Sequence, residues 1–283
     1  MSEAVYTVGA IDYDNVFAHA TRLFVPPLIA AARLAPGQHV LDVATGTGAA
    51  AQAAVERVGP SGAVVAGDIS PAMLDVARRK LNEGPVTFEL FDAHALPYPD
   101  SRFDAVICQL GLMLFADPCR ALAEFHRVLR VGGRVAVSVT TTPERTLYMR
   151  IGATIARHVP NKAASFNRYF SIGDAERLQA LLAAAGFRDV HVESECSELQ
   201  FASFDDYFSG IESGATLSGQ EYICLAERVR RAVREDVRRS LLAGRSDGPL
   251  VVKMEVLIGS GLRDRHVETI AADDAVRSYH NGG

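Results

Sequence analysis

The ten residues from His39 to Gly48 constrain the fold of this chain more than any other stretch. They read HVLDVATGTG, an apolar run that ends in a turn of small residues, and residues 49–55 after it are strong helix formers. A strand, a tight turn and a helix in this order begin a βαβ unit, with the turn at the carboxyl edge of a parallel sheet. Gly46 and Gly48 allow the backbone to come close to a ligand, and the free N–H groups of the helix start point at it.

The same turn fits two classes of cofactor. Residues 46–51 also satisfy the G-x-G-x-x-G/A pattern of dinucleotide-binding folds, and Asp68 follows Gly48 by twenty residues. This stretch alone therefore leaves open a nicotinamide or flavin dinucleotide on one side and S-adenosylmethionine on the other. A turn that binds no ligand is the least favoured of the three interpretations.

The rest of the chain continues the alternation of strands and helices. Between apolar runs of strand length lie helical segments with an i, i+3, i+4 apolar stripe, of which residues 118–129 are the clearest. We expect strands at residues 39–43, 63–67, 86–90, 103–109, 134–139, 187–195 and 250–258. The alternation predicts an α/β fold with a doubly wound, seven-stranded, mostly parallel sheet and helices on both faces.

Three acidic residues, Asp42, Asp68 and Asp92, fall at the carboxyl ends of successive predicted strands, where open α/β sheets bind ligands. They would repel the doubly charged pyrophosphate of a dinucleotide. S-adenosylmethionine instead brings a sulfonium and an ammonium, so the charge balance favours it. Asp68 could accept hydrogen bonds from both ribose hydroxyls in either case, and Asp92 could accept one from the amino group of adenine.

Several short motifs follow one another in a fixed order on the expected elements. They are VLDVATGTG at 40–48, GDIS at 67–70 with ML at 73–74, DA at 92–93 with LP at 96–97, FD at 103–104 and RVLRVGG at 127–133. In these motifs the chain resembles the class I S-adenosylmethionine-dependent methyltransferases, most closely the branch similar to quinone-biosynthesis C-methyltransferases. The resemblance is specific from Val40 to Val139 and looser to Val190. Ala44 departs from the glycine of many members, and we expect its methyl group to be tolerated.

The resemblance implies a Rossmann-like methyltransferase fold with helical lid and cap segments, and S-adenosylmethionine as the cofactor. The cofactor-binding residues that it implies are Asp42, Ala44, Thr45, Gly46, Gly48, Asp68, Ile69, Met73, Asp92, Ala93, Gln109 and Tyr13. Candidates for the acceptor site are Phe17, His158, Tyr169 and Phe170. For Met73 a place in the core is an equally good interpretation, and Gln109 could equally be a polar residue that ends a strand.

We divide the chain into four parts. Residues 1–38 form a helical lid, which in the family folds over the cofactor, and residues 39–200 form the α/β core with a helical insertion at about 141–172. Residues 201–249 form a helical cap over the carboxyl edge of the sheet. Residues 250–283 form the last strand and a polar tail that starts at Gly259.

Composition and charge limit the kinds of partner that we expect for this chain. The net charge of −5 argues weakly against nucleic acid as the main partner, and no apolar run approaches the length of a membrane span. The N-terminus lacks the layout of a secretory signal, and four scattered cysteines are most simply free thiols, so we expect a cytoplasmic protein. No His or Cys has a partner at metal spacing, so we expect no metal. A homodimer and a monomer both remain open.

These observations favour a methyltransferase that acts on a small, largely apolar acceptor, such as a phenol, a quinol or a secondary metabolite. Two alternatives stay open: an NAD(P)-dependent oxidoreductase, and a non-catalytic protein that only binds S-adenosylmethionine. No residue stands out as a catalytic base, so the sequence leaves the catalytic residues unassigned.

Overall fold

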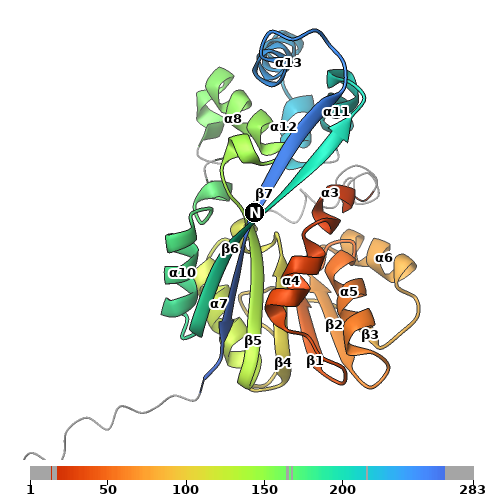
Figure 1. Ribbon diagram of the computed structural model, residues 1–283, viewed down its shortest axis with the longest axis vertical. Coiled ribbons are helices and arrows are strands. Elements are labelled where there is room, and N and C mark those ends of the chain that lie inside the picture. The colour runs from red at the N-terminus through yellow and green to blue at the C-terminus, as the bar shows by residue number, and fades with distance from the viewer. Residues whose placement is uncertain (1–13, 15–17, 164–165, 167, 215, 265–283) are drawn as a thin grey trace, which may run out of the picture.

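The computed structural model describes residues 14, 18–163, 166, 168–214 and 216–264. Within them, one seven-stranded sheet has the order β3-β2-β1-β4-β5-β7-β6 (Figure 1). The strands are β1 His39–Val43, β2 Ala63–Asp68, β3 Val86–Leu90, β4 Phe103–Gln109, β5 Leu129–Thr140, β6 Arg188–Phe201 and β7 Leu250–Leu262. The first five strands are parallel, and β7 runs antiparallel between β5 and β6. The predicted doubly wound, mostly parallel sheet is confirmed.

Helices cover both faces of the sheet. One face carries α4 (Val25–Ala32), α5 (Ala49–Val58) and α6 (Pro71–Lys80), and the other carries α7 (Pro118–Val128) and α10 (Ala175–Ala184) (Figure 1). The α7 stripe of Ala121, Leu122, Phe125 and Val128 is fully buried, as its periodicity predicts. Helix α6 begins at Pro71, because Ser70 caps it by accepting a hydrogen bond from the Met73 N–H.

The amino edge of the sheet is held by Asp104, near the start of β4. Its carboxylate accepts a 2.7 Å hydrogen bond from the His39 N–H and a 2.8 Å hydrogen bond from Arg130. Asp104 thus joins β4 to β1 and β5 at the edge opposite the predicted ligand site. Its role is therefore structural.

Strands β6 and β7 are longer than their sequence pattern predicts. Pairing of β5 with β7 ends at Val256, but β6 continues to pair with β7 as far as Leu250, so the two strands leave the sheet as a ribbon. The expectation of a tail from Gly259 is wrong for its first residues, since Gly259–Leu262 belong to β7. A Cβ atom at Gly259 would lie 2.8 Å from Cδ1 of Leu182 in α10, so a larger residue there would force this side chain to shift.

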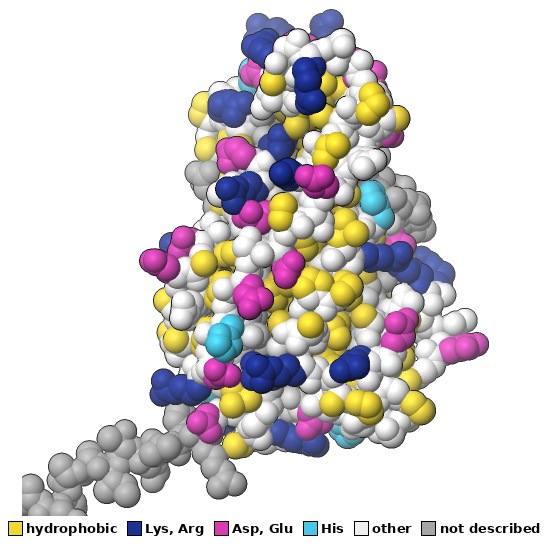
Figure 2. All heavy atoms as spheres, in the orientation of Figure 1, with side chains coloured by type: hydrophobic (Ala, Val, Ile, Leu, Met, Phe, Trp, Pro, Cys, Tyr) yellow, Lys and Arg dark blue, Asp and Glu magenta, His cyan; other side chains and the backbone are white. Residues whose placement is uncertain are grey.

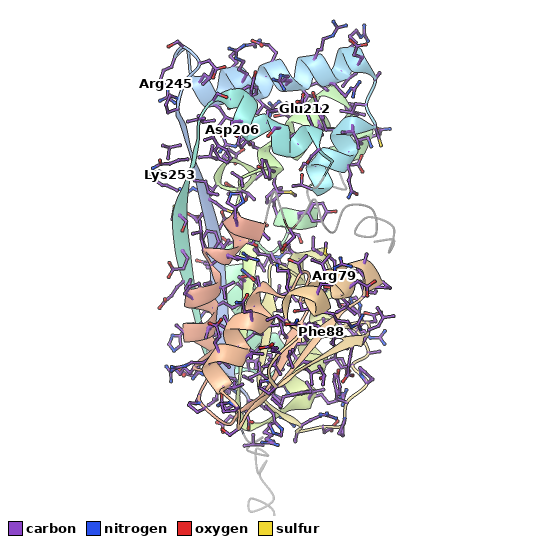
Figure 3. All side chains as sticks on the ribbon, turned by 90° about the vertical axis from the view of Figure 1, so that its right-hand side faces the viewer. Arg79, Phe88, Asp206, Glu212, Arg245 and Lys253 are labelled. Atoms are coloured by element: carbon purple, nitrogen blue, oxygen red, sulfur yellow. The ribbon has the colours of Figure 1, made fainter. Side chains whose placement is uncertain are left out.

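The ribbon carries a group of helices at one end of the molecule, beyond the carboxyl edge of the sheet (Figures 1 and 3). These helices are α11 (Phe204–Glu212), α12 (Leu217–Ile223) and α13 (Glu227–Leu242). Helix α8 (Met149–His158), from the segment after β5, packs against α12 and α13. The buried Tyr207 of α11 donates a 2.6 Å hydrogen bond to the Leu147 carbonyl, which ties the two segments together.

The remaining elements are short. They are α3 (Ala18–Arg22) and the 3-10 helices η1 (Leu112–Leu114), η2 (Pro143–Arg145), η3 (Pro160–Lys162) and η4 (Arg168–Phe170). Among the described residues, no helix is both long enough and apolar enough to pass through a bilayer. On the face drawn in Figure 2, Lys and Arg side chains lie among Asp and Glu side chains rather than in a field of one sign.

Candidate active site

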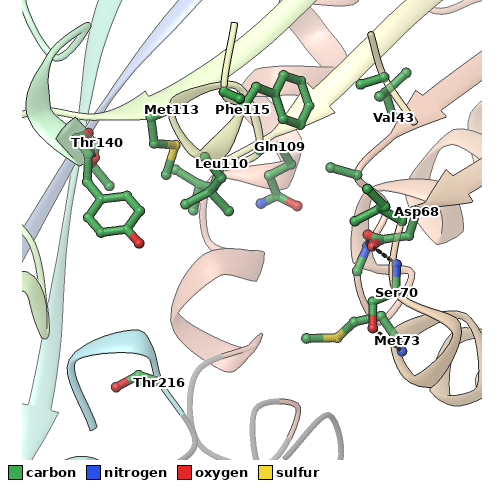
Figure 4. A pocket seen from close by; sticks show the side chains of 18 of the residues that line it. Val43, Asp68, Ser70, Met73, Gln109, Leu110, Met113, Phe115, Thr140 and Thr216 are labelled. Carbon is green, nitrogen blue, oxygen red and sulfur yellow. Dashed lines mark hydrogen bonds between the residues drawn. The ribbon is translucent and has the colours of Figure 1, made fainter. Parts of the chain in front are cut away.

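A cavity of about 360 Å³ lies at the carboxyl edge of the sheet, between the core and the cap helices (Figure 4). We call its two halves the cofactor side and the cap side. The cofactor side is lined from the ends of β1 to β4 by Val43, Ala44, Gly46, Asp68, Ile69, Ser70, Met73, Phe91, Asp92, Ala93, His94, Gln109 and Leu110. The cap side is lined by Gly111, Met113, Leu114, Phe115, Ala116, Thr140, Thr146, Tyr148, Met149, Tyr169, Thr216 and Ser218.

The turn after β1 has a backbone that favours glycine at three positions. Ala44, Gly46 and Gly48 have φ angles of 57°, 55° and 88°, in the left-handed region. Ala44 carries its methyl group there at a cost of about 1–2 kcal/mol relative to glycine, which the fold tolerates as expected. A Cβ atom at Gly48 would lie 3.0 Å from Leu81 and 3.2 Å from Ala77, so α6 packs directly on the turn.

Asp42 lies beneath this turn and is completely buried. Its Oδ2 atom accepts a 2.6 Å hydrogen bond from the Thr45 hydroxyl, while Oδ1 has no hydrogen-bond partner among the described residues. Burial, together with the charge of Asp68, raises the pKa of Asp42 to about 7. The arrangement leaves an unsatisfied carboxylate under the cavity floor, where a cationic ligand above it would be stabilised.

Asp68 stands at the end of β2 and lines the cavity. Its two oxygens accept 2.9 Å hydrogen bonds from the N–H groups of Ser70 and Gly46, and burial still raises its pKa above the usual value. Beside it, the Ile69 side chain is 52% exposed although it is apolar, while Met73 is buried. An exposed apolar side chain next to an acid that could accept hydrogen bonds from ribose hydroxyls offers a packing surface for a flat ring such as adenine.

Asp92 lies just after the end of β3, the strand that pairs with the Asp68 end of β2, and it lines the cofactor side. Burial alone would raise its pKa, but hydrogen bonds from His94 outweigh this and hold the pKa below its usual value. The His94 backbone N–H donates to Asp92 at 2.9 Å, and the ring Nδ1 lies 2.6 Å from the same oxygen. The other ring nitrogen accepts a hydrogen bond from the Asp117 N–H at 3.2 Å, so both nitrogens of His94 are engaged.

The cap side combines hydroxyl groups with apolar side chains. Thr140, Thr146, Tyr148, Tyr169, Thr216 and Ser218 supply the hydroxyls, and Met113, Leu114, Phe115 and Met149 supply the apolar surface. None of the described residues on this side is Lys, Arg, Asp or Glu. Burial raises the pKa of Tyr148 to about 12, so its hydroxyl keeps its proton at neutral pH.

The structure brings most of the predicted site residues together, but not all of them. Those that line the cavity are Ala44, Gly46, Asp68, Ile69, Met73, Asp92, Ala93, Gln109 and Tyr169. Asp42, Thr45 and Gly48 belong to the turn or its support without lining the cavity, and Phe170 packs against the core beside it. Tyr13 and Phe17 lie outside the described residues.

His158 does not line the cavity, contrary to the place expected for it. It ends α8, and its Nε2 atom lies 2.8 Å from a carboxylate oxygen of Asp236 on α13. His158 and Asp236 are 78 positions apart in the sequence, and their contact joins α8 to α13. The His158 side chain is therefore turned toward α13.

Sequence reasoning missed Tyr148, Met149, Thr216 and Ser218 on the cap side. The first two follow the predicted strand within the predicted insertion, which was a usable signal for this region. Thr216 and Ser218 fall within the predicted cap over the carboxyl edge, but the long ribbon that positions α12 decides which residues of the cap reach the cavity.

The lining defines the class of ligand that fits. Asp68 and Asp92 are the carboxylates on the cofactor side, and no described lining residue is Lys or Arg. In the described part of the chain, no group of three or more His, Cys, Asp or Glu side chains could hold a metal ion. Fold and site together define a Rossmann-like enzyme whose nucleoside pocket suits a positively charged cofactor.

Comparison with known proteins identifies the family. A family model described as a methyltransferase domain matches residues 41–137. The demethylmenaquinone methyltransferase of Deinococcus radiodurans is 38% identical over 165 residues, which cover 53% of this chain and 68% of that protein. A ubiquinone/menaquinone biosynthesis C-methyltransferase of Xanthomonas axonopodis pv. citri is 36% identical over 182 residues, 59% of this chain and 72% of that protein. The chain belongs to the class I S-adenosylmethionine-dependent methyltransferases.

Solved structures agree on the fold. The YcgJ protein of Bacillus subtilis superposes with a TM-score of 0.55 at 19% identity, over 87% of this chain and 99% of that one. Phosphoethanolamine N-methyltransferase 2 of Haemonchus contortus gives a TM-score of 0.56 at 17% identity, over 90% of this chain and 57% of that one. Because the chain belongs to this family, S-adenosylmethionine is the methyl donor. Family membership also excludes a dinucleotide cofactor, which the glycine turn alone had left open.

Proposed function

We propose that this methyltransferase acts on a small, uncharged and largely apolar acceptor of the phenol, quinol or related secondary-metabolite class. The observation that carries the proposal is the cap side of the cavity, where hydroxyl groups lie among apolar side chains. A phosphate or carboxylate on the acceptor would lack a charged partner among the described lining residues, and burying it there would be costly. The two quinone-biosynthesis relatives support a quinol within this class.

The cofactor side would hold the methyl donor. In this proposal Asp68 accepts hydrogen bonds from the ribose hydroxyls, Asp92 and Ala93 contact adenine, and Ile69 packs on its ring. Within the turn at 44–48 the N–H groups of Thr45, Gly46 and Gly48 are engaged by protein oxygens, so in this proposal the start of α5, just after the turn, faces the single carboxylate of the donor. Asp42 supplies negative charge near the turn only when its carboxyl is deprotonated, which a cationic ligand in the cavity would favour.

The reaction needs little beyond positioning. S-adenosylmethionine supplies a methyl group on a sulfonium. The nucleophilic atom of the acceptor bonds to the methyl carbon in line as the sulfur–carbon bond breaks, S-adenosylhomocysteine leaves as a neutral thioether, and the acceptor loses its proton to solvent. Holding the reacting groups in place can lower the barrier by about 7–11 kcal/mol in favourable cases. His94 is a poor candidate for a general base, because Asp92 and the Asp117 N–H engage both of its ring nitrogens. We therefore propose catalysis by proximity and exclusion of water.

We further propose that residues 201–249 and the insertion at about 141–172 together cover the acceptor. The lid expected for residues 1–38 is too long, because α4 packs against β4, β5 and β7 as part of the core, so we propose the lid role only for the residues before α4. Contact of α8 with α12 and α13 supports the first assignment. The buried hydrogen bond from Tyr207 to the Leu147 carbonyl supports it as well.

The test is a methyl-transfer assay with matched acceptors, read by mass spectrometry. Neutral phenols and quinols should be methylated, and the same rings with an added phosphate or carboxylate should not. Ser218→Ala should raise the KM for the acceptor several-fold and leave the affinity for S-adenosylhomocysteine unchanged. Ser209→Ala, an exposed serine on α11, is the matched control and should behave as the parent chain. Preference for the charged acceptors would overturn the proposal.

A further inference from the structure

Gln109 connects two segments that are 88 residues apart in the sequence. Its side chain stands at the carboxyl end of β4 and lines the cavity between Asp68 and Thr140 (Figure 4). Its Nε2 atom donates a 2.7 Å hydrogen bond to the carbonyl oxygen of Thr21 in α3. Because a carbonyl only accepts hydrogen bonds, the amide nitrogen must face Thr21, and this fixes which way the amide is turned.

The acceptor of this bond belongs to a well-packed segment. Thr21 is buried, its hydroxyl donates to the Ala18 carbonyl at 3.1 Å, and its own carbonyl also accepts from the Phe24 N–H at 3.1 Å. The Phe24 side chain is itself buried in the core. Gln109 therefore contacts α3 at a point that the fold holds in place.

The backbone beside Gln109 is strained and tightly held. Leu110 has a left-handed φ of 51°, and its N–H lies 3.0 Å from Ser138 Oγ and 3.1 Å from the Ser138 carbonyl oxygen. A Cβ atom at the next residue, Gly111, would lie 2.7 Å from the Cβ of Ala44 in the glycine turn. Strain of this kind costs of the order of 1–3 kcal/mol and concentrates at functional sites. Because the backbone next to it is fixed, Gln109 can respond to a bound ligand only through its side-chain amide group.

The amide oxygen of Gln109 is the atom left for a ligand. Among the described residues, its Oε1 atom receives no hydrogen bond, while the nitrogen of the same amide is engaged by Thr21. The amide end of the side chain faces the open space of the cavity in Figure 4.

We infer that Gln109 is a positioning residue that couples ligand binding in the cavity to the docking of α3. Its nitrogen holds the Thr21 carbonyl, and its oxygen accepts a hydrogen bond from the bound ligand, either from the ammonium of the methyl donor or from a hydroxyl of the acceptor. A donor at the oxygen polarises the amide and strengthens the bond at its nitrogen. Coupling is reciprocal, so docked α3 strengthens ligand binding by the same factor. The inference rests on the proposed use of the cavity.

Backbone hydrogen exchange tests the coupling without relying on turnover. The probes are S-adenosylhomocysteine alone, which carries the ammonium, and S-adenosylhomocysteine with hydroquinone, which adds hydroxyls. Amides at 44–48 report binding in the turn, amides at 18–24 report the docking of α3, and amides at 256–258 in β7 report the integrity of the sheet. In the parent chain we expect ligand to slow exchange at 18–24 by about tenfold, a typical coupling factor.

Two variants separate coupling from folding. Gln109→Met should keep ligand-dependent protection at 44–48 and lose it at 18–24. Gln109→Glu keeps the shape but places an oxygen against the Thr21 carbonyl, so exchange at 18–24 should be faster even without ligand. Gln52→Met, at an exposed position on α5, is the matched control and should behave as the parent chain. Unchanged ligand-dependent protection at 18–24 in Gln109→Met would overturn the inference.

The two probes distinguish the source of the hydrogen bond. Protection at 18–24 with S-adenosylhomocysteine alone identifies the ammonium, and protection that needs hydroquinone identifies the acceptor hydroxyl; both support the coupling. Protection at 44–48 with no change at 18–24 under either condition would overturn the coupling alone. A lack of protection at 44–48 would overturn the proposed cofactor site, and the coupling with it.

Discussion

The Gly46 N–H donates a 2.9 Å hydrogen bond to Oδ2 of Asp68, which lies 22 residues further along the chain. The acid at the end of β2 thus holds the glycine turn at the end of β1. The other oxygen of Asp68 accepts from the Ser70 N–H, at the start of α6. One carboxylate therefore organises the turn, the strand end and the next helix around the place assigned to the ribose.

Replacing Asp68 by alanine should remove cofactor binding and loosen the turn. A ligand at about a hundred times its Kd stabilises a fold by about 2.7 kcal/mol, which for a chain of this size raises the Tm by several degrees. The parent chain should show this shift with S-adenosylhomocysteine, and Asp68→Ala should show almost none. Asp75→Ala, at an exposed site on α6, should keep the full shift. An unchanged shift in Asp68→Ala would refute the assignment of Asp68 to the ribose.

Asp42 should make stability depend on pH in a defined direction. Its pKa is about 7 in the fold against an ordinary value of 3.8, so between these two pH values the folded state binds a proton that the unfolded state lacks. The free energy of unfolding contributed by this group therefore falls as pH rises from about 4 to about 7, and levels off above that. The cause is burial of the charged carboxylate.

The variant Asp42→Asn separates the contribution of Asp42 to the pH dependence of stability from the contributions of the other carboxyl groups. Urea unfolding of both chains at a series of pH values gives the difference in their free energies of unfolding. We expect the parent chain to lose a few kcal/mol relative to Asp42→Asn across that window, since each pKa unit is worth about 1.4 kcal/mol. A difference that does not change with pH would show that Asp42 titrates normally.

Arg127 should stabilise the loop after β3, which carries the residues proposed to contact adenine. Its guanidinium donates to the carbonyls of Leu96 and Tyr98 at 3.1 and 2.7 Å and pairs with Glu124, so it holds the chain just after Asp92. Lysine cannot reproduce this set of bonds. Arg127→Lys should lower stability by about 1–3 kcal/mol and weaken binding of S-adenosylhomocysteine, both measured by thermal unfolding with and without ligand. Arg231 forms an exposed ion pair with Glu227 on α13. Arg231→Lys is the control and should change neither the stability nor the binding of S-adenosylhomocysteine.

The sequence predicts those parts of the molecule that local patterns encode. The strands, the glycine turn and the acids at the strand ends follow from periodicity and spacing, and these place Asp68 and Asp92 at one edge of the sheet. The ribbon does not follow in this way, because from Leu250 to Glu255 strand β7 pairs with β6 alone and no longer with β5. The reach of Ser218 into the cavity depends on that ribbon.

His158 is a second example of a side chain whose position a local sequence pattern does not determine. A histidine in a predicted pocket wall is a reasonable candidate, but its orientation is decided by Asp236, which is 78 residues away. Gln109 was predicted to be either a cofactor ligand or a polar strand end. Its contact with Thr21 depends on how α3 packs against the sheet, and no pattern within β4 encodes it.

Gly111 offers the sharpest test of how the ends of β1 and β4 fit together. A Cβ atom there would lie 2.7 Å from the Cβ of Ala44 and 2.8 Å from Sγ of Cys108, and the Ala44 contact has no flexible side-chain end that could move away. Gly111→Ala should therefore push the β4 end away from the glycine turn. We expect a loss of about 1–3 kcal/mol of stability, as for overpacking elsewhere in protein cores.

The same substitution should weaken binding of S-adenosylhomocysteine at least tenfold, because the displaced residues Ala44 and Leu110 line the cofactor side of the cavity. Titration calorimetry gives the affinity, and thermal unfolding gives the stability. Gly248→Ala is the matched control, since a Cβ atom there meets nothing within 4 Å and no left-handed φ is involved. Parent-like affinity in a folded Gly111→Ala chain would mean that the contact between the two strand ends does not shape the cofactor site.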